Sequence, residues 1–290
     1  MIKTALPLVC LTVLAAGCAR SGPMPAEPEA TSFQVGSLQL TALRDAKFAA
    51  PNDGRTFGLD VGPEAVGAVL KTAGAAEDHI DLSVDALLVR TGGRLVLIDT
   101  GLGAGAQGVL PASFAKAGLK PSDVTDVLIT HTHGDHVGGL ASGGALAFPN
   151  ATIRMSAKEW AWMKSQGGAL AGVIAAKVAT FEPGTMVAPG ITAVAVDGHT
   201  PGHVAYEVVS GPDRLLDIGD TAHSSIVSLA RPDWAMGFDT DKPLGKASRI
   251  ATLTRLAASH ELVFAPHFPF PGVGRIETAG SGFRWVPGLK

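Results

Sequence analysis

Cysteine is nearly absent from this chain of 290 residues: it occurs twice, as Cys10 and Cys18, both close to the N-terminus. The rest of the chain therefore has no residue for a disulfide, a thiolate metal ligand or a cysteine nucleophile. Long apolar runs are also missing beyond the N-terminal segment, since no stretch approaches the roughly 18 residues of a membrane-spanning helix. The sequence thus predicts a domain without a disulfide framework and without a transmembrane helix.

Excess charge of one sign is lacking as well. The chain has 23 Lys and Arg against 26 Asp and Glu, which gives a net charge of −3. A nearly neutral chain has no strong field for a phosphate backbone, so we expect no nucleic-acid partner. Hydrophobic residues make up 46% of the sequence, which is enough for one domain with a full core.

The first 18 residues have the layout of an export signal. Lys3 supplies a positive charge, an uncharged apolar run follows, and small residues precede Cys18. The run is too short for a membrane-spanning helix. Cys18 resembles the lipidated residue of a bacterial lipoprotein, although Ala15 stands where such sites more often carry Leu, so ordinary cleavage stays open. We expect export to the periplasm, with an anchor on the outer membrane if Cys18 is lipidated.

The expected organisation is a signal peptide over 1–18, a flexible tether over 19–31 and a single domain over 32–290. Strand and helix patterns alternate through that domain without a long linker. The expected strands are 32–44, 86–89, 95–98, 124–129, 153–155, 191–196, 204–209, 215–218 and 262–264. The expected helices are 63–72, 111–117, 157–164 with Ser156 as its cap, and 242–259 with Leu244, Ile250, Leu253 and Leu256 at helical spacing. This order predicts an α/β domain with helices on the outer faces.

Four residues of metal-binding types fall within six positions, namely His131, His133, Asp135 and His136. They follow the expected strand 124–129, where a loop can turn its side chains inward. Imidazole and carboxylate are ligands that suit Zn²⁺ and similar ions. His131 and His133 can face one ion, and Asp135 and His136 can face another. Four ligands so close together exceed what a chance loop composition gives, so the segment predicts a metal site.

Three more residues extend the pattern: His199, Asp220 and His267 each follow an apolar strand. This order resembles the metallo-β-lactamase superfamily, with its His-x-His-x-Asp-His motif, a single His, a single Asp and a final His. The segment from Asp99 to Gly101 matches an early motif of that family. The resemblance covers the chain from about Asp99 onward. It implies an αββα sandwich whose metal site lies at one edge, between two similar halves.

The resemblance also implies roles for the residues at the matching positions. The first metal ion would be held by His131, His133 and His199, the second by Asp135, His136 and His267, with Asp220 bridging them. Zinc is the first candidate for both ions, and manganese, cobalt and iron stay open. A metal-bridging hydroxide would be the nucleophile, with Asp220 and Asp135 as the catalytic carboxylates. Asp99 and His203 are expected to hold the ligands in place through hydrogen bonds.

Several features bear on the branch of the superfamily. Asp220 argues against a true β-lactamase, because those enzymes usually lack the bridging carboxylate. Acyl-homoserine lactonases resemble the metal pattern but place a Tyr near that Asp, whereas Tyr206, the one tyrosine, precedes Asp220 within an expected strand. Segments 232–239, 267–272 and 283–287 resemble the methyl parathion hydrolase branch. Members of that branch are exported dimetal hydrolases of aryl phosphotriesters, lactones and esters.

The expected substrate contacts are Phe268, His223 and Trp160. Phe268 adjoins a ligand, His223 follows Asp220 by three residues, and Trp160 lies on the helix after the first metal loop. Core packing is the alternative for the tryptophan. Aromatic walls beside a metal edge suit an apolar small molecule. We therefore expect hydrolysis of a neutral apolar ester or lactone, with an aryl phosphotriester as the open alternative.

Two other functions stay open. A mononuclear iron persulfide dioxygenase would share the fold and the histidines, and its iron content would distinguish it. A non-catalytic binding lipoprotein would share the fold alone, but the complete ligand set argues against decay of the site. The resemblance also leaves a homodimer open, and contact with the membrane is expected only through the lipid anchor.

Overall fold

The computed structural model of the protein describes residues 22–289, so the expected signal peptide and Cys18 lie outside the described residues. The expected flexible tether over 19–31 is corrected in the part that the structure describes, because two strands begin there. Strand β1 (Gly22–Met24) pairs with residues 47–49 of the first sheet, and strand β2 begins at Ala30. Within residues 22–289, none of the helices combines the length and the apolar character that crossing a membrane requires.

The first sheet is built from the N-terminal half of the chain, in the order β1-β3-β4-β5-β6-β9-β10, with β2 paired to β3. Its further strands are β2 (Ala30–Val35), β3 (Leu38–Pro51), β4 (His79–Thr91), β5 (Arg94–Ile98), β6 (Asp126–Leu128), β9 (Thr152–Ser156) and β10 (Val178–Phe181). Apolar residues occupy both faces of β5 and of the second half of β4, from Ala86 to Val89, whereas polar and apolar residues alternate over the first half of β4. This composition is typical of strands that are covered on both sides.

The second sheet comes from the C-terminal half, and its strands follow one another in sequence order. They are β11 (Met186–Ala188), β12 (Ile191–Ala195), β13 (Val204–Ser210), β14 (Asp213–Asp217), β15 (Leu262–Phe264), β16 (Val273–Ala279) and β17 (Gly282–Pro287). A small hairpin of β7 (Ala141–Ser142) and β8 (Ala145–Leu146) stands apart from both sheets. The expected strands are all present, and the strands that were not predicted are β1, β7, β8, β10, β11, β16 and β17.

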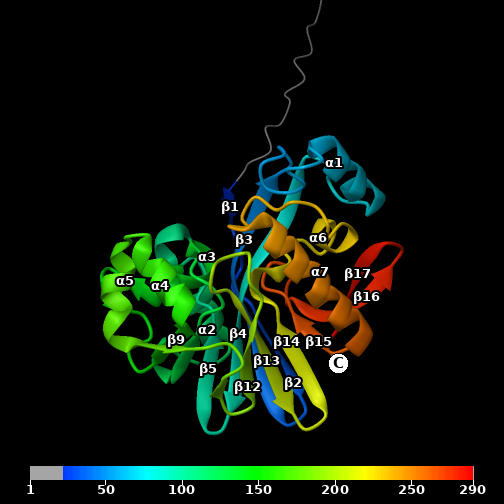
Figure 1. Cartoon of the computed structure of the whole chain (residues 1–290). Helices are drawn as coiled ribbons and strands as arrows, with labels where there is room; N and C mark the ends of the chain where they lie inside the picture. Colours follow the sequence, from blue (N-terminus) through cyan, green and yellow to red (C-terminus); the bar gives the residue numbers. More distant parts are fainter. Residues whose placement is uncertain (1–21, 290) are drawn as a thin grey trace, which may run out of the picture.

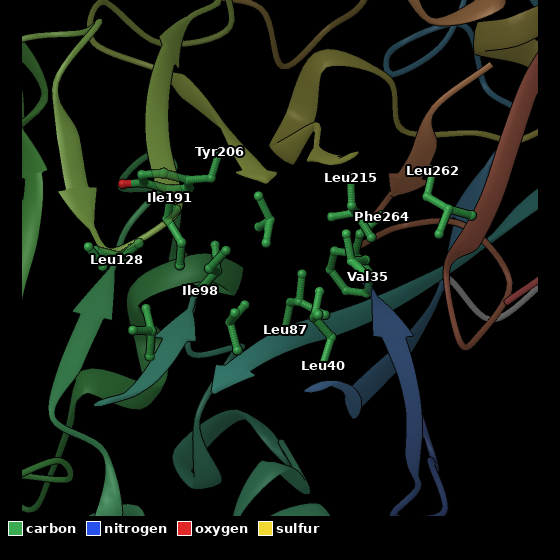
Figure 2. Packing of buried hydrophobic residues seen from close by; sticks show 14 of the residues in the cluster. Val35, Leu40, Leu87, Ile98, Leu128, Ile191, Tyr206, Leu215, Leu262 and Phe264 are labelled. Atoms are coloured by element: carbon green, nitrogen blue, oxygen red, sulfur yellow. The ribbon is translucent and has the colours of Figure 1, made fainter. Parts of the chain in front are cut away.

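The core between the two sheets is a continuous apolar layer. Leu40, Leu87 and Ile98 from the first sheet meet Tyr206 and Phe264 from the second, and all of them are fully buried (Figure 2). Side chains of alternate residues along each strand enter this layer, and their neighbours enter the outer layers. Burial of this layer is what holds the two halves of the chain face to face.

Helices cover the outer faces of both sheets (Figure 1). Those on the first sheet are α2 (Leu110–Lys116), α4 (Ala157–Ser165) and α5 (Ala169–Ile174), and the long α7 (Lys242–Ser259) covers the second. The short α1 (Pro63–Thr72) packs near α6 (Val227–Ala230), and α3 (Gly134–Val137) lies at the sheet edge. The expected αββα sandwich is thereby confirmed.

Helix α7 buries only part of its expected apolar stripe. Leu253 and Leu256 are fully buried against the second sheet, whereas Leu244 is 44% and Ile250 is 37% exposed. In the first half of the helix the buried residues are Gly245 and Arg249, so the buried face differs there from the expected apolar stripe. The helix bounds, by contrast, agree with the expected ones, with Asp241 capping the N-terminus.

The strand directions bring chemistry to one edge of the sandwich. Strands β5, β6 and β9 run parallel, and β14 and β15 run parallel in the other sheet. Strand β12 runs the same way as β14, because each is antiparallel to β13. The carboxyl ends of β5, β6, β12, β14 and β15 lead directly into the segments that hold Asp99, His131, His199, Asp220 and His267.

Removal of the Tyr206 hydroxyl should destabilise the protein by about 1–3 kcal/mol. This hydroxyl donates a 2.7 Å hydrogen bond from β13 to the carbonyl oxygen of Ile129, across the interface between the sheets. Tyr206→Phe would leave that buried carbonyl without its side-chain donor. Urea unfolding measures the change in free energy. The control Thr72→Val removes an exposed hydroxyl from α1 and should stay within about 0.5 kcal/mol; equal values for the two variants would contradict the prediction.

Candidate metal centre

Seven side chains from five segments converge at the edge of the sandwich. His131 and His133 follow β6 in an extended loop, and Asp135 and His136 begin the short helix α3. The other three follow β12, β14 and β15: they are His199, Asp220 and His267. The structure divides them into two groups, each with ligand atoms within 4.8 Å of one another: His131, His133, His199 and Asp220, and Asp135, His136 and His267.

The first group is a tight triangle of imidazole nitrogens. His199 Nε2 lies 2.9 Å from His133 Nδ1 and 3.2 Å from His131 Nε2, and the latter two nitrogens are 3.1 Å apart. Asp220 Oδ2 closes the group at 3.1 Å from His199 Nε2 and 3.5 Å from His131 Nε2.

The second group shares the Asp220 carboxylate through its other oxygen. Asp220 Oδ1 lies 3.1 Å from His136 Nε2 and 3.0 Å from His267 Nε2, which are 3.3 Å from each other. Asp135 Oδ2 stands 3.8 and 3.7 Å from the same two nitrogens. One buried carboxylate therefore faces both groups, as the bridging role of Asp220 requires.

The donor set fits divalent cations because of how the outward nitrogens are held. His136 Nδ1 contacts Asp99 Oδ2 at 2.7 Å, His199 Nδ1 contacts Asp239 Oδ1 at 3.1 Å, and His267 Nδ1 contacts the Ser83 carbonyl at 2.8 Å. Each acceptor holds the proton on the outward nitrogen, so the inward Nε2 of a neutral ring carries a lone pair. Within each group the imidazole nitrogens that face inward then lie about 3 Å from one another, with their lone pairs converging. A bound cation would stabilise this arrangement.

The pKa shifts within the cluster also favour a bound metal ion. Burial alone would raise the pKa of Asp220, but the surrounding imidazoles, His136 first, hold it well below the ordinary value. Burial alone would lower the pKa of His267, but Asp220 raises it to about 9. Burial lowers the pKa of His133 to about 4. An ionised buried carboxylate thus draws positive charge into the site, and a metal ion can supply it in place of protons.

Asp99 and His203 lie where they can brace the ligands. Asp99 accepts hydrogen bonds from the Thr130 backbone and hydroxyl as well as contacting His136, so it joins β5 to the first ligand loop. His203 Nδ1 contacts the Val196 carbonyl, and its Nε2 accepts the Asp220 N–H at 3.1 Å. A Cβ at Gly219 would stand 2.6 Å from that Nε2, so only glycine permits this approach.

A cavity of about 440 Å³ opens onto the cluster. Its polar lining comes from the site itself, through His133, Asp135, Asp220, His223 and His267. Its apolar lining comes from β3, β4 and two loops, and consists of Phe48, Leu82, Val84, Leu102 and Phe238. Within residues 22–289, the lining includes neither lysine nor arginine.

Two of the expected substrate contacts lie elsewhere. Phe268 is fully buried behind the site, where its ring meets Trp285 edge-on at 5.0 Å between centroids. The side chain belongs to the apolar cluster on the outer face of the second sheet, so the position next to His267 in sequence does not line the cavity. Trp160 packs against the outer core of the first sheet. Trp162 instead approaches the cluster, with its ring 5.8 Å from that of His133.

Sequence reasoning missed two supporting residues. Asp239 joins His199 to the buried guanidinium of Arg249, with Nη1 3.3 Å from Asp239 Oδ2. Glu159 is a fully buried carboxylate on α4 that contacts two ligand loops. Its spacing from Ser156 matches a helix-capping pair, so the sequence pattern alone assigns Glu159 to the helix cap and gives no sign of its contacts with the ligand loops. The apolar wall was also missed, because Phe48 and Leu82 lie far from the motifs in sequence.

Zinc should stabilise the chelator-treated protein through this cluster. At free zinc of 100 times Kd, binding adds about 2.7 kcal/mol, which is roughly 5–10 °C in Tm for a domain of this size. Asp220→Ala should abolish most of this increase, because Asp220 faces both groups. Thermal unfolding with and without zinc measures it, and Asp213→Ala, at an exposed residue of β14, is the control. If zinc stabilised Asp220→Ala as much as the wild-type protein, Asp220 would not be a metal ligand shared by the two groups.

Curated relatives match parts of the chain. A protein of Mycobacterium tuberculosis, named as a probable metallo-hydrolase, is 29% identical over 208 residues, which is 56% of this chain and 66% of that protein. A hydroxyacylglutathione hydrolase of Pseudomonas syringae pv. syringae is 29% identical over 140 residues, or 48% of each chain. The matched part thus spans less than two thirds of these relatives, about half of the second.

Solved structures match nearly the whole fold. AidC, a dizinc quorum-quenching lactonase in complex with an N-acyl-L-homoserine product, has a TM-score of 0.84 and 29% identity, covering 90% of this chain and 98% of its own. The hydrolase AbOPH has a TM-score of 0.82 and 28% identity, covering 91% and 98%. The sequence pattern of the metallo-beta-lactamase superfamily matches residues 79–267, well over half of the chain. With the sandwich fold and the paired ligand groups at its edge, this match shows that the chain belongs to the metallo-beta-lactamase superfamily.

Proposed function

We propose that the protein hydrolyses a neutral, apolar ester or lactone. The observation that carries this proposal is the cavity wall, in which five apolar side chains stand beside the cluster without a lysine or arginine among the described lining residues. A substrate with several carboxylates, such as a glutathione thioester, would find no lysine or arginine partner among the described residues of that wall. The likeness to AidC, which holds an acyl-homoserine product, supports a lactone.

The two groups of residues would hold two divalent ions, zinc first, with Asp220 shared between them. When bound, such ions supply hydroxide from water near neutral pH and positive charge for the oxygen of the attacked group. Asp135 lines the cavity with its side chain 31% exposed. Burial alone would raise the pKa of Asp135, but His136 and His267 lower it, so the ionised carboxylate can accept a proton from water or from the substrate.

His223 is the polar residue of the cavity wall that belongs to neither group. Its ring is fully buried, lies parallel to that of His267 at 5.6 Å between centroids, and adjoins Phe238 at 5.8 Å. Its Nε2 stands 3.1 Å from Asp220 Oδ2, but outside hydrogen-bond geometry, and both ring nitrogens lack a hydrogen bond. We propose that His223 contacts the substrate and that its ring N–H donates a hydrogen bond to the carbonyl oxygen or to the leaving-group oxygen.

An aryl phosphotriester is the second candidate. It is neutral and apolar, so the same wall accommodates it, and segments 232–239, 267–272 and 283–287 resemble the methyl parathion hydrolase branch. Attack at phosphorus and attack at a carbonyl use the same nucleophile and differ in the shape of the reacting centre. Only turnover distinguishes the two substrates.

The zinc- or manganese-loaded protein should prefer an aromatic lactone over an aryl dimethyl phosphotriester. We expect a ratio of kcat/KM of about a hundredfold or more, which is roughly 2.7 kcal/mol in transition-state stabilisation. Side-by-side steady-state kinetics measure it. The reverse preference would assign the protein to the phosphotriesterases. Turnover of neither substrate, together with one tightly held iron and oxygen consumption, would favour the iron dioxygenase.

His223→Leu should lower kcat/KM for the preferred substrate by about 10²-fold while leaving two metal ions per chain. Leucine has no hydrogen-bond donor to replace the imidazole N–H, whereas the ligands of both groups are untouched. Kinetics combined with metal analysis measure the two effects separately. His260→Asn, at the exposed end of α7, is the control. Wild-type kinetics in His223→Leu would remove this residue from the site.

A further inference from the structure

Glu159 forms an unusual set of contacts for a helix residue. It lies in the first turn of α4 and its side chain is fully buried. Oε1 accepts hydrogen bonds from the Thr132 N–H at 2.7 Å and from the Thr132 hydroxyl at 2.8 Å. Oε2 accepts them from the Thr200 hydroxyl at 2.7 Å and from the Gly202 N–H at 3.0 Å. One buried carboxylate therefore takes four hydrogen bonds from two separate loops.

Both loops carry ligands of the same group. Thr132 stands between His131 and His133, and Thr200 directly follows His199. Each oxygen of Glu159 thus holds one loop, and the rigid carboxylate sets the distance between them. The three imidazole nitrogens held in this way are those that lie 2.9–3.2 Å apart.

The packing around Glu159 fixes its position. Ser156 caps α4 by accepting the Glu159 N–H, and the same hydroxyl donates to the Gly202 carbonyl at 2.7 Å. A Cβ at Gly202 would stand 2.3 Å from the Glu159 nitrogen. The loop after His199 consequently lies directly on the first turn of α4, and the carboxylate has no room to move away.

The second group is braced by other residues. Asp99 contacts His136, the Ser83 carbonyl contacts His267, and the backbone N–H of Ser83 donates to the His267 carbonyl at 3.1 Å. None of the four hydrogen bonds of Glu159 is made by Asp135, His136, His267 or a residue directly next to one of them, although Thr132 belongs to the segment that continues to Asp135. Glu159 therefore bonds to residues directly beside ligands of the first group, whereas Asp99 contacts His136 of the second group itself.

We propose that Glu159 is a positioning residue for the first metal ion alone, because it joins the His131–His133 loop to the His199 loop. This inference rests on the proposed dimetal function. Without the carboxylate, the two loops would each keep their backbone pairing but would lose their fixed separation. Loss of such a partner to metal ligands typically weakens metal binding by about 10- to 100-fold.

Zinc titration in two single-group backgrounds tests the proposal. His267→Ala removes a ligand of the second group and leaves the first, and His133→Ala does the reverse. Glu159→Gln keeps the shape of the side chain but replaces one of its two acceptor oxygens with an NH2 group. That NH2 group would face a backbone N–H, which is also a donor, so the hydrogen bond there is lost. The substitution should raise the zinc Kd about 10- to 100-fold in the His267→Ala background and less than about twofold in the His133→Ala background. Glu182→Gln, after β10, is the matched control.

The outcomes separate the alternatives. Equal weakening in both backgrounds would make Glu159 a general structural residue, and unchanged Kd in both would overturn its role; either result contradicts the proposal. If Glu159→Gln does not fold, Thr200→Val removes one of the four hydrogen bonds and should show a smaller loss with the same selectivity. Binding of two ions by the His267→Ala protein would refute the proposed ligand set, and with it the assignment of Glu159 to one of two groups, whereas the other outcomes leave the ligand set intact.

Discussion

The buried carboxylate of Asp220 places negative charge in the interior, and the rest of the site is organised around compensating it. Each of its oxygens faces imidazole nitrogens at 3.0–3.1 Å, those of His136 and His267 on one side and that of His199 on the other. A buried charge is stable only where partners surround it. Two cations sharing this carboxylate would satisfy both the buried charge and the converging lone pairs.

The sandwich supplies the rigidity that such a site needs. Four strands of the two sheets, β6, β12, β14 and β15, end at one edge and lead into the ligand segments, so the ligands lie next to backbone that is already fixed by ladders of hydrogen bonds. Backbone hydrogen bonds also cross between the sheets there: Val204 N–H donates to the Thr130 carbonyl, and Asp85 N–H donates to the Pro266 carbonyl. The apolar layer below excludes water from these contacts, which strengthens them.

Support and recognition come from different parts of the chain. Carboxylates behind the ligands, Asp99, Asp239 and Glu159, hold the imidazoles in orientation and face away from the cavity. The apolar wall in front, with Phe48 and Phe238 among its residues, faces the substrate. Separation of the two layers allows the wall to change with substrate while the metal cluster keeps its geometry.

The sequence by itself determined the bounds of α1, α7 and β15, which depend on local spacing and on helix and strand ends. Its dense motif marked the residues of the cluster, and the resemblance of that motif to the metallo-β-lactamase superfamily predicted the sandwich fold. The tertiary structure alone decided that Phe268 packs inward, that Leu244 and Ile250 are exposed, and that Glu159 serves the ligand loops rather than its own helix cap. The direction of a side chain depends on which distant segment occupies the adjacent space, and no local pattern contains that information.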